Sequence, residues 1–193
     1  MAMRPAVFLD KDGTVLADVP YNVDPAKMVY APMAFAALNR LGAAGVTLVV
    51  VSNQSGVARG LFPLAALDAV QVKLAAMFMA AGAWLEGFYW CPHHPAGRVA
   101  GFAVDCDCRK PRPGLLLRAA GELGLDLARS WFIGDILDDV EAANRAGCRS
   151  LLLDVGHETE WREGPHRVPD ARAADLDAAA RLVLADWPAP GRQ

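Results

Sequence analysis

Short apolar runs alternate with longer segments of helical periodicity along most of this chain. Apolar or β-branched runs predict strands at 7–10, 46–52, 88–90, 131–134 and 149–154. Helical spacing and end signals predict helices at 34–44, 63–81, 113–123, 137–146 and 175–184. Strands that alternate with helices predict an α/β fold, a three-layer Rossmann-like arrangement with helices on both faces of a parallel sheet.

The same pattern predicts one domain over residues 1–193, with no large cap inserted between the strands. One apolar stripe should bury the second predicted helix, 63–81; its members are Leu64, Leu67, Val70, Leu74, Met77, Phe78 and Ala81. The polar, proline-interrupted stretch 156–174 is predicted to be loop, and the tail 186–193 to be disordered.

Composition and charge exclude several classes of protein. Hydrophobic residues make up 54% of the chain, but no apolar run approaches the roughly 20 residues that a membrane helix needs. The formal net charge of −3 gives no reason to expect a nucleic-acid partner. The first five residues lead into the first strand without a signal peptide's apolar region, and four cysteines then favour a reducing compartment. We therefore expect a cytoplasmic monomer.

Two carboxylates, Asp10 and Asp12, follow the first predicted strand directly and precede a Gly-Thr turn. In an extended segment, residues two apart point the same way, so the two charges repel unless a cation lies near them. This pair therefore indicates a nucleophile and an acid/base group beside Mg²⁺. A solvated, Asp-rich turn is the alternative interpretation.

Ser52 and Asp135 lie at the ends of two further predicted strands. Parallel sheets bind ligands at the carboxyl ends of their strands, so Asp10, Ser52 and Asp135 should converge. Taken singly, Ser52 fits an ordinary turn and Asp135 fits a helix N-cap. Taken alone, the basic pair Arg109-Lys110 fits a solvated surface. A phosphate site is favoured only because all these groups occur together, in this order along the chain.

Four segments in this order resemble the motifs of the haloacid-dehalogenase phosphatase superfamily. They are Asp10-Lys11-Asp12-Gly13-Thr14, Ser52-Asn53-Gln54-Ser55-Gly56, Arg109-Lys110-Pro111, and Gly134-Asp135 with Asp138-Asp139. Together with the cysteine cluster described below, the stretch from Val7 to Asp154 resembles the D-glycero-D-manno-heptose 1,7-bisphosphate 7-phosphatase family. The histidinol-phosphate phosphatases are its sister family.

The resemblance implies Mg²⁺-dependent hydrolysis through an aspartyl-phosphate. Asp10 would be the nucleophile, and Asp12 would protonate the leaving alcohol and then activate water. Asp10, the backbone carbonyl of Asp12, and Asp135 would hold Mg²⁺. Many members of the family carry a basic residue directly after the last of these; here it is Ile136.

The resemblance also implies the groups that hold the substrate. Ser52 and the backbone N–H of Asn53 would donate to the phosphoryl oxygens, and Lys110 would add its charge. Asp139 would orient Lys110 or a metal-bound water. Arg109 is the candidate for the second phosphate or the sugar hydroxyls of a sugar bisphosphate.

Two pairs of soft ligands, Cys91-x-His93 and Cys106-x-Cys108, flank a loop that contains Gly97 and Gly101. Four nitrogen and sulfur ligands predict a structural, tetrahedral Zn²⁺ in the loop 91–108. Unrelated free thiols or a catalytic thiol are the alternatives. His94 is expected not to be a ligand, and Cys148 is expected to be a small buried hydrophobe.

The long loop 91–108 resembles that of the heptose-bisphosphate phosphatases. In the histidinol-phosphate phosphatases, the segment that leads to the Cys-x-Cys pair is shorter. We therefore expect removal of the 7-phosphate of D-glycero-D-manno-heptose 1,7-bisphosphate, with histidinol-phosphate hydrolysis as the nearest alternative. A phosphotransferase that passes the phosphoryl group to a second alcohol remains open. A zinc-ribbon interaction module also remains open, although it leaves Asp10, Asp12 and Asp135 unexplained.

Overall fold

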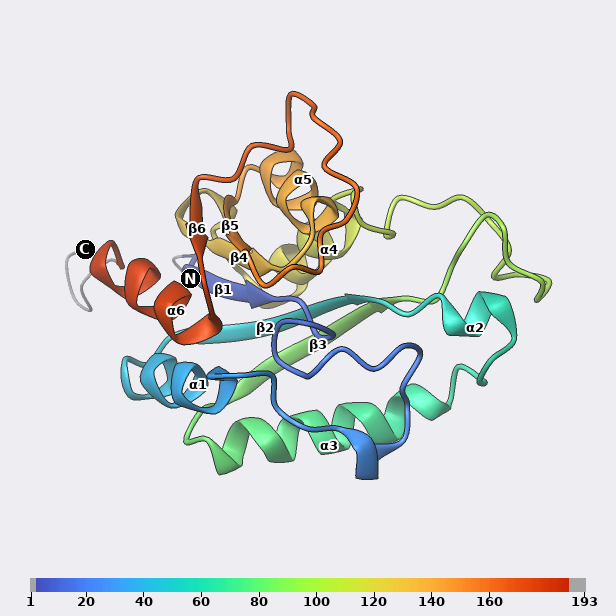
Figure 1. Ribbon diagram of the computed structural model, residues 1–193, viewed down its shortest axis with the longest axis horizontal. Helices are drawn as coiled ribbons and strands as arrows, with labels where there is room; N and C mark the ends of the chain where they lie inside the picture. Colours follow the sequence, from blue (N-terminus) through green and yellow to red (C-terminus); the bar gives the residue numbers. More distant parts are fainter. Residues whose placement is uncertain (1–2, 188–193) are drawn as a thin grey trace.

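The computed structural model describes residues 3–187 and centres on a six-stranded sheet (Figure 1). The strands are β1 (Ala6–Leu9), β2 (Thr47–Asn53), β3 (Leu85–Cys91), β4 (Trp131–Gly134), β5 (Arg149–Leu153) and β6 (Ala171–Ala173). They lie in the order β3-β2-β1-β4-β5-β6, and each neighbouring pair is parallel. The parallel α/β sheet that the sequence predicts is therefore confirmed.

Helices cover both faces of this sheet. They are α1 (Ala34–Ala43), α2 (Gly56–Arg59), α3 (Ala66–Ala80), α4 (Gly114–Leu123), α5 (Leu137–Ala146) and α6 (Leu176–Ala185). Two short 3₁₀ helices, η1 (Pro25–Lys27) and η2 (Leu127–Arg129), lie in connections. In Figure 1, α4 and α5 lie above the sheet, and α1, α3 and α6 lie on its other side. These are the three predicted layers.

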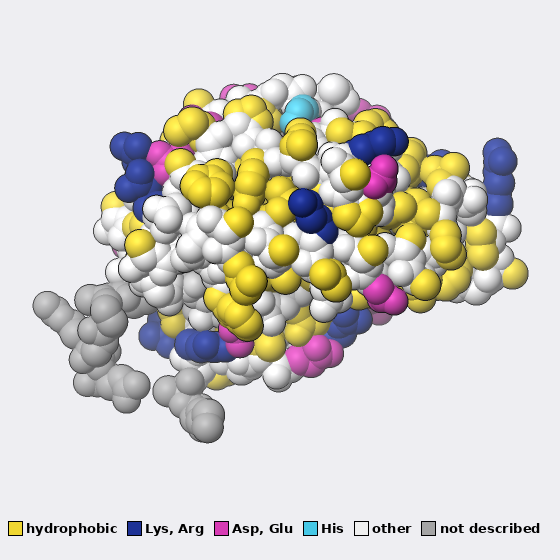
Figure 2. Space-filling model, turned by 90° about the horizontal axis from the view of Figure 1, so that it is seen from below, with side chains coloured by type: hydrophobic (Ala, Val, Ile, Leu, Met, Phe, Trp, Pro, Cys, Tyr) yellow, Lys and Arg dark blue, Asp and Glu magenta, His cyan; other side chains and the backbone are white. Residues whose placement is uncertain are grey.

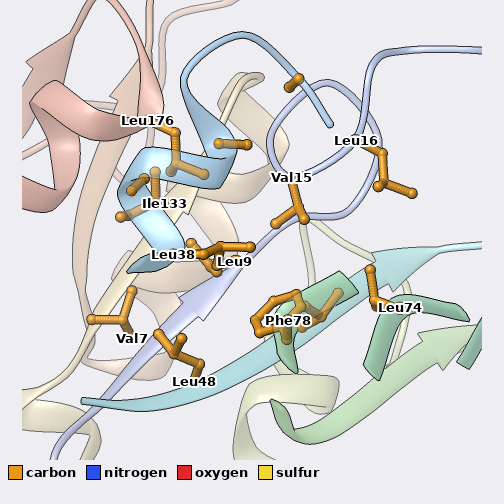
Figure 3. Close-up of a cluster of buried hydrophobic side chains, with 14 of the residues drawn as sticks. Val7, Leu9, Val15, Leu16, Leu38, Leu48, Leu74, Phe78, Ile133 and Leu176 are labelled. Atoms are coloured by element: carbon orange, nitrogen blue, oxygen red, sulfur yellow. The ribbon is translucent and has the colours of Figure 1, made fainter. Parts of the chain in front are cut away.

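Side chains of β1 alternate between the two faces, because successive strand residues point in opposite directions. Val7 and Leu9 join the larger apolar cluster, which includes Leu38 of α1, Phe78 of α3 and Leu176 of α6 (Figure 3). The other two residues of β1 pack with α4 and α5. Both faces of the strand are buried, which explains its continuous apolar run.

The order of the strands places a topological switch between β1 and β4. The chain leaves β1 toward β2 and β3, and it returns to β4 on the opposite side of β1. In such sheets a crevice opens at the carboxyl ends of the two strands that flank the switch. Asp10 follows β1 and Asp135 follows β4, so the fold brings both to this crevice.

Several sequence predictions are wrong in detail. The stretch 156–174 is not all loop, because it contains β6. This strand has three residues and pairs only with β5, so it shows little periodicity. Leu64 is 40% exposed and lies before α3, whereas the rest of its predicted stripe is buried. The short helix α2 was not predicted.

The C-terminal segment is ordered further than the sequence predicts. Asp186 and Trp187 belong to the described structure, and Trp187 packs against the larger core cluster, so the predicted disordered tail does not begin at 186. Residues 188–193 of that predicted tail lie outside the described residues. Within residues 3–187, no insertion forms a large cap, and no helix is long and apolar enough to cross a membrane.

Candidate active site

A cavity of about 230 Å³ opens at the carboxyl ends of β1, β2 and β4. Most of its lining is polar, and it collects residues that lie far apart in the sequence. They are Asp10, Asp12, Asp18, Ser52, Asn53, Lys110, Asp135, Ile136 and His157. Every residue expected to act at the transferred phosphoryl group therefore lies around one cavity.

Lys110 lies at the floor of this cavity and is only 3% exposed. Its Nζ is 2.6 Å from Oδ1 of Asp10 and 2.5 Å from Oδ1 of Asp139. Burial acts to lower the pKa of Lys110, but the two carboxylates outweigh it and raise the pKa above its ordinary value. Lys110 is thus a fixed cation beside Asp10, and Asp139 holds it there.

Asp135 is 5% exposed and lies close to the other carboxylates. Thr14 donates to its Oδ1 at 3.3 Å, and Nδ1 of His157 lies 2.7 Å from its Oδ2. Burial, followed by the nearby charge of Asp10, raises the pKa of Asp135 to about 7. A carboxylate in this position is stabilised in its charged form by a cation.

The side chain of Asp12 is held by two partners. Nζ of Lys11 lies 2.7 Å from its Oδ1, and Nε2 of Gln54 donates to its Oδ2 at 3.1 Å. Gln54 also donates to Oγ of Ser52 at 2.8 Å. Burial raises the pKa of Asp12, and Lys11 opposes this shift. A raised pKa suits a group that must donate a proton and later accept one.

The side chain of Asn53 makes two hydrogen bonds to the backbone of Lys110, which the sequence did not predict. Its amide oxygen accepts from the backbone N–H of Lys110 at 3.0 Å, and its Nδ2 donates to the carbonyl of Lys110 at 3.1 Å. The end of β2 is thereby joined to the segment that carries the lysine. The side chain of Asn53 positions Lys110, while its backbone N–H stays the predicted phosphate donor.

The carboxylates of Asp10, Asp135 and Asp139 fit a divalent cation. One oxygen from each lies within 4.8 Å of the others, and all three residues are buried. Lys110 alone leaves two of the three negative charges unbalanced. Hard oxygen donors of this kind suit Mg²⁺. The side chain of Asp12 is outside this cluster, and its predicted contact with the cation is through its backbone carbonyl.

The four residues predicted to bind zinc also lie close together. Cys91, His93, Cys106 and Cys108 each place one ligand atom within 4.8 Å of the others. The three sulfur atoms are 3.2 to 3.5 Å apart, and Nδ1 of His93 is 3.3 Å from Sγ of Cys108. All four cysteines are free thiols. Such close thiols and an imidazole nitrogen can hold a metal ion.

Comparison with known proteins also indicates a phosphatase. A HAD-hydrolase-like family model matches residues 107–179. A D-glycero-β-D-manno-heptose-1,7-bisphosphate 7-phosphatase of Yersinia pestis is 40% identical over 170 residues, which cover 88% of this chain and 87% of that protein. The enzyme of the same name from Escherichia coli K12 is 39% identical over 94% of this chain and 93% of its own length. This chain belongs to that phosphatase family.

A solved structure of the family supports the fold as well. The D,D-heptose 1,7-bisphosphate phosphatase of B. bronchiseptica, complexed with magnesium and phosphate, superposes with a TM-score of 0.76. It is 33% identical and covers 94% of this chain and 99% of its own. The resemblance to haloacid-dehalogenase phosphatases is thus confirmed.

Three further residues that the sequence analysis singled out lie away from the main cavity of this phosphatase. Arg109 lines a neighbouring cavity that shares Lys110, and its Nη1 donates to the carbonyl of His93 at 3.4 Å. His94 is outside the four-ligand cluster and contacts Arg59, with 3.2 Å between Nε2 and Nη2. Cys148 is 4% exposed in the core beneath α4 and α5.

Sequence reasoning missed three residues of this site: Asp18 and His157 line the cavity, and Gln54 contacts two of its lining residues. Gln54 stands inside a quoted motif, but nothing in the motif says that it joins Ser52 to Asp12. His157 stands alone in a polar stretch, 22 residues after Asp135. Only the path of the chain after β5 brings His157 back to the cavity, so its sequence offers no signal.

Proposed function

We propose that this phosphatase removes the 7-phosphate of D-glycero-β-D-manno-heptose 1,7-bisphosphate. The observation that carries the proposal is the single cavity that gathers Asp10, Asp12, Ser52, Lys110 and Asp135. The relatives' names, which specify this sugar bisphosphate and its β anomer, supply the substrate. A small-molecule substrate agrees with the modest size of the cavity.

In this proposal Asp10 attacks phosphorus in line with the leaving oxygen and becomes an aspartyl-phosphate. Asp12 gives its proton to the leaving sugar oxygen and then takes one from the water that hydrolyses the acyl phosphate. Ser52 and the backbone N–H of Asn53 donate to the phosphoryl oxygens. Lys110 is held against Asp10 and neutralises charge on the transferred group.

Mg²⁺ is the proposed cation of this site, held by Asp10, Asp135 and the backbone carbonyl of Asp12. When bound it would neutralise phosphoryl charge and orient the group for attack. The magnesium and phosphate in the B. bronchiseptica enzyme support this choice. Asp139 stays with Lys110 in this scheme, because their short contact already satisfies it.

We further propose that Cys91, His93, Cys106 and Cys108 bind a structural Zn²⁺. Four protein ligands leave no open position for catalysis, which is the mark of a structural site. The loop between β3 and α4 has few apolar side chains, so a metal would order it. A reducing compartment such as the cytoplasm would keep the thiols free to bind.

Arg109 is proposed to hold the second phosphate, from the cavity that adjoins Lys110. A guanidinium can hold a phosphate through two parallel hydrogen bonds, and an ammonium cannot. Arg109→Lys should therefore reduce kcat/KM for the bisphosphate about 10-fold or more while sparing a small monoester such as p-nitrophenyl phosphate. Arg98→Lys, an exposed arginine of the same loop that does not line this cavity, is the matched control.

A substrate panel tests the proposal as a whole. Both anomers of the heptose bisphosphate, histidinol phosphate and p-nitrophenyl phosphate are compared by kcat/KM with Mg²⁺ present. The β anomer should be the best substrate. A higher kcat/KM for histidinol phosphate would reject the proposed substrate, and transfer of phosphate to an added alcohol in place of water would indicate a phosphotransferase.

The nucleophile is tested separately. Asp10→Asn removes the charge that attacks phosphorus but keeps the size of the side chain, so hydrolysis should fall by at least about 10³-fold. Acid quenching during turnover should trap a phosphoryl group on Asp10, identified by mass spectrometry of its peptide. Phosphate on another residue, or an Asn variant within tenfold of the wild type, would reject this assignment.

A further inference from the structure

Two consecutive residues of the segment after β5 contact the two residues that flank Ile136, one through a side chain and one through the backbone. Nδ1 of His157 lies 2.7 Å from Oδ2 of Asp135, and Oε2 of Glu158 accepts from the backbone N–H of Leu137 at 2.6 Å. The apolar side chain of Ile136, which follows Asp135 directly, offers it no donor. A positively polarised partner for Asp135 therefore comes from another part of the chain.

His157 and Thr14 together fix the plane of the Asp135 carboxylate. Thr14 donates to Oδ1 of Asp135 at 3.3 Å. Because an ionised carboxylate oxygen can only accept, the hydrogen bond to Oδ2 is donated by Nδ1–H of His157. Carboxylates that bind metals are commonly oriented by such outer hydrogen bonds. Gly13 makes this approach possible: a Cβ there would lie 2.1 Å from Oδ2 of Asp135 and 2.7 Å from Nδ1 of His157.

Glu158 anchors the segment that carries the histidine. Its Oε2 accepts from the first residue of α5, whose N–H has no partner within the helix, and its Oε1 accepts from the backbone N–H of Glu160 at 2.7 Å. A negative charge is also favoured at this end of a helix. Since the imidazole of His157 is 36% exposed, this anchor, more than burial, fixes its place.

We propose that His157 is a positioning residue that orients Asp135 for the divalent cation, with Glu158 holding it in place. The inference rests on the proposed function only in that Asp135 is taken as a ligand of the cation.

Binding of Mn²⁺ or Mg²⁺ to the zinc-loaded protein, measured by calorimetry, tests the proposal without turnover. His157→Ala should weaken binding about 10- to 100-fold, with Asp135→Asn as the reference for loss of a ligand. His157→Asn, whose Nδ2 stands near the position of Nδ1, should recover most of the affinity. His157→Gln reaches further out, as Nε2 does, and should not. His166→Ala, an exposed histidine of the same segment, is the control.

Glu158 supplies a second, independent arm. Glu158→Gln should keep the acceptor oxygen and bind the cation nearly as the wild type does, whereas Glu158→Ala should weaken binding. Adding Glu158→Ala to His157→Ala should cost little more, because both act through one contact. Unchanged thermal unfolding of the cation-free variants would show that each is folded.

Cation affinity within twofold of the wild type in His157→Ala would overturn the inference and leave the proposed function intact. A wild type that binds the cation but fails to hydrolyse the heptose bisphosphate would instead reject the proposed substrate. Equal affinity of the Asn and Gln variants would also overturn the inference, since the geometry assigns the contact to Nδ1.

Discussion

Lys110 is a buried cation whose charged form is stabilised by two neighbouring carboxylates, which also hold it beside the proposed nucleophile. Its ammonium group contacts Asp10 and Asp139, and its backbone is held by the amide of Asn53. Breaking a buried ion pair by removing one partner costs about 3–5 kcal/mol, because the other charge is left without compensation. Single residues at this site therefore serve the fold and the chemistry together.

Gln54 gives a prediction at this scale, because it holds Oδ2 of Asp12 and Oγ of Ser52 at once. Gln54→Leu should leave Asp12 poorly oriented and lower kcat for an alkyl phosphate, whose leaving group needs a proton, by about 10²-fold. Hydrolysis of p-nitrophenyl phosphate, with its better leaving group, should fall much less. Steady-state kinetics on both substrates measure the difference.

The control for this change is Gln71→Leu, on the exposed face of α3. Asp12→Asn should show the same dependence on the leaving group as Gln54→Leu, if Gln54 acts through Asp12. Equal losses on the two substrates would mean that Gln54 serves phosphate binding alone.

Among the elements, the loop between β3 and α4 contains most of the Cys/His cluster that is proposed to bind zinc. Cys91 belongs to the buried end of β3, and the other three ligands come from the loop itself. The backbone N–H groups of Arg98 and Val99 donate to the carbonyl of Ala58, so the loop also packs against α2 at the right of Figure 1. The Cys/His cluster thus links β3, the loop and the segment that carries Lys110.

Cys106→Ser should therefore remove the bound zinc and lower the melting temperature. Binding of structural zinc can contribute on the order of 10 kcal/mol to folding, so the loss should be large. Elemental analysis and thermal unfolding measure the two effects. Cys148→Ala changes a buried thiol outside the cluster and should keep the zinc. Wild-type protein purified with zinc available but holding none would contradict the structural site.

The contact between α1 and α6 gives a prediction about pH. Arg40 and Arg181 both bond to Asp177, whose side chain is 4% exposed, and the hydrogen bond from Arg40 is the main cause that lowers the pKa of Asp177. A lowered carboxyl pKa adds stability above the ordinary pKa of about 4, and this stability is lost as the pH falls through the folded value.

Asp177→Asn should lower the free energy of unfolding by about 1 kcal/mol at pH 7, because both arginines are partly exposed. The difference from the wild type should shrink as the pH falls below about 4. Urea unfolding at several pH values measures it. Asp68→Asn, an exposed first-turn acid of α3, should show no such trend. A difference that grows toward acid pH would contradict the assignment.

For the whole molecule, the sheet places all the site residues within one chain. Residues of this one chain line the cavity at the strand ends. Figure 2 shows the side of the molecule that α3 covers, where apolar side chains are interspersed with few charges. Val72 and Met79 of α3 and the nearby Trp84 are exposed. Apolar atoms make up a large part of most protein surfaces, so these residues alone give no reason to expect a partner.

We therefore expect an active monomer of 20.6 kDa. Light scattering coupled to size-exclusion chromatography measures the mass, and activity per chain should not change with protein concentration. A mass twice as large, with activity that falls on dilution, would show that a second copy contributes to the enzyme.

The sequence by itself determined five of the six strands, most of the helices and most of the residues that the structure gathers into the two candidate sites. Buried parallel strands need continuous apolar runs, and ligand groups follow such strands directly, so Asp10 and Asp135 could be found by reading along the chain. The Cys-x-His and Cys-x-Cys pairs could likewise be found, because their ligands are close in sequence. These features are local, and local patterns survive without a structure.

Tertiary structure alone decided the contacts between groups that are distant in the chain. The strand β6 has three residues and depends on pairing with β5, so no periodicity marks it. The amide of Asn53 holds Lys110 across 57 residues, and His157 reaches Asp135 across 22. Such hydrogen bonds depend on where the backbone returns after each crossover, which residue types alone do not specify.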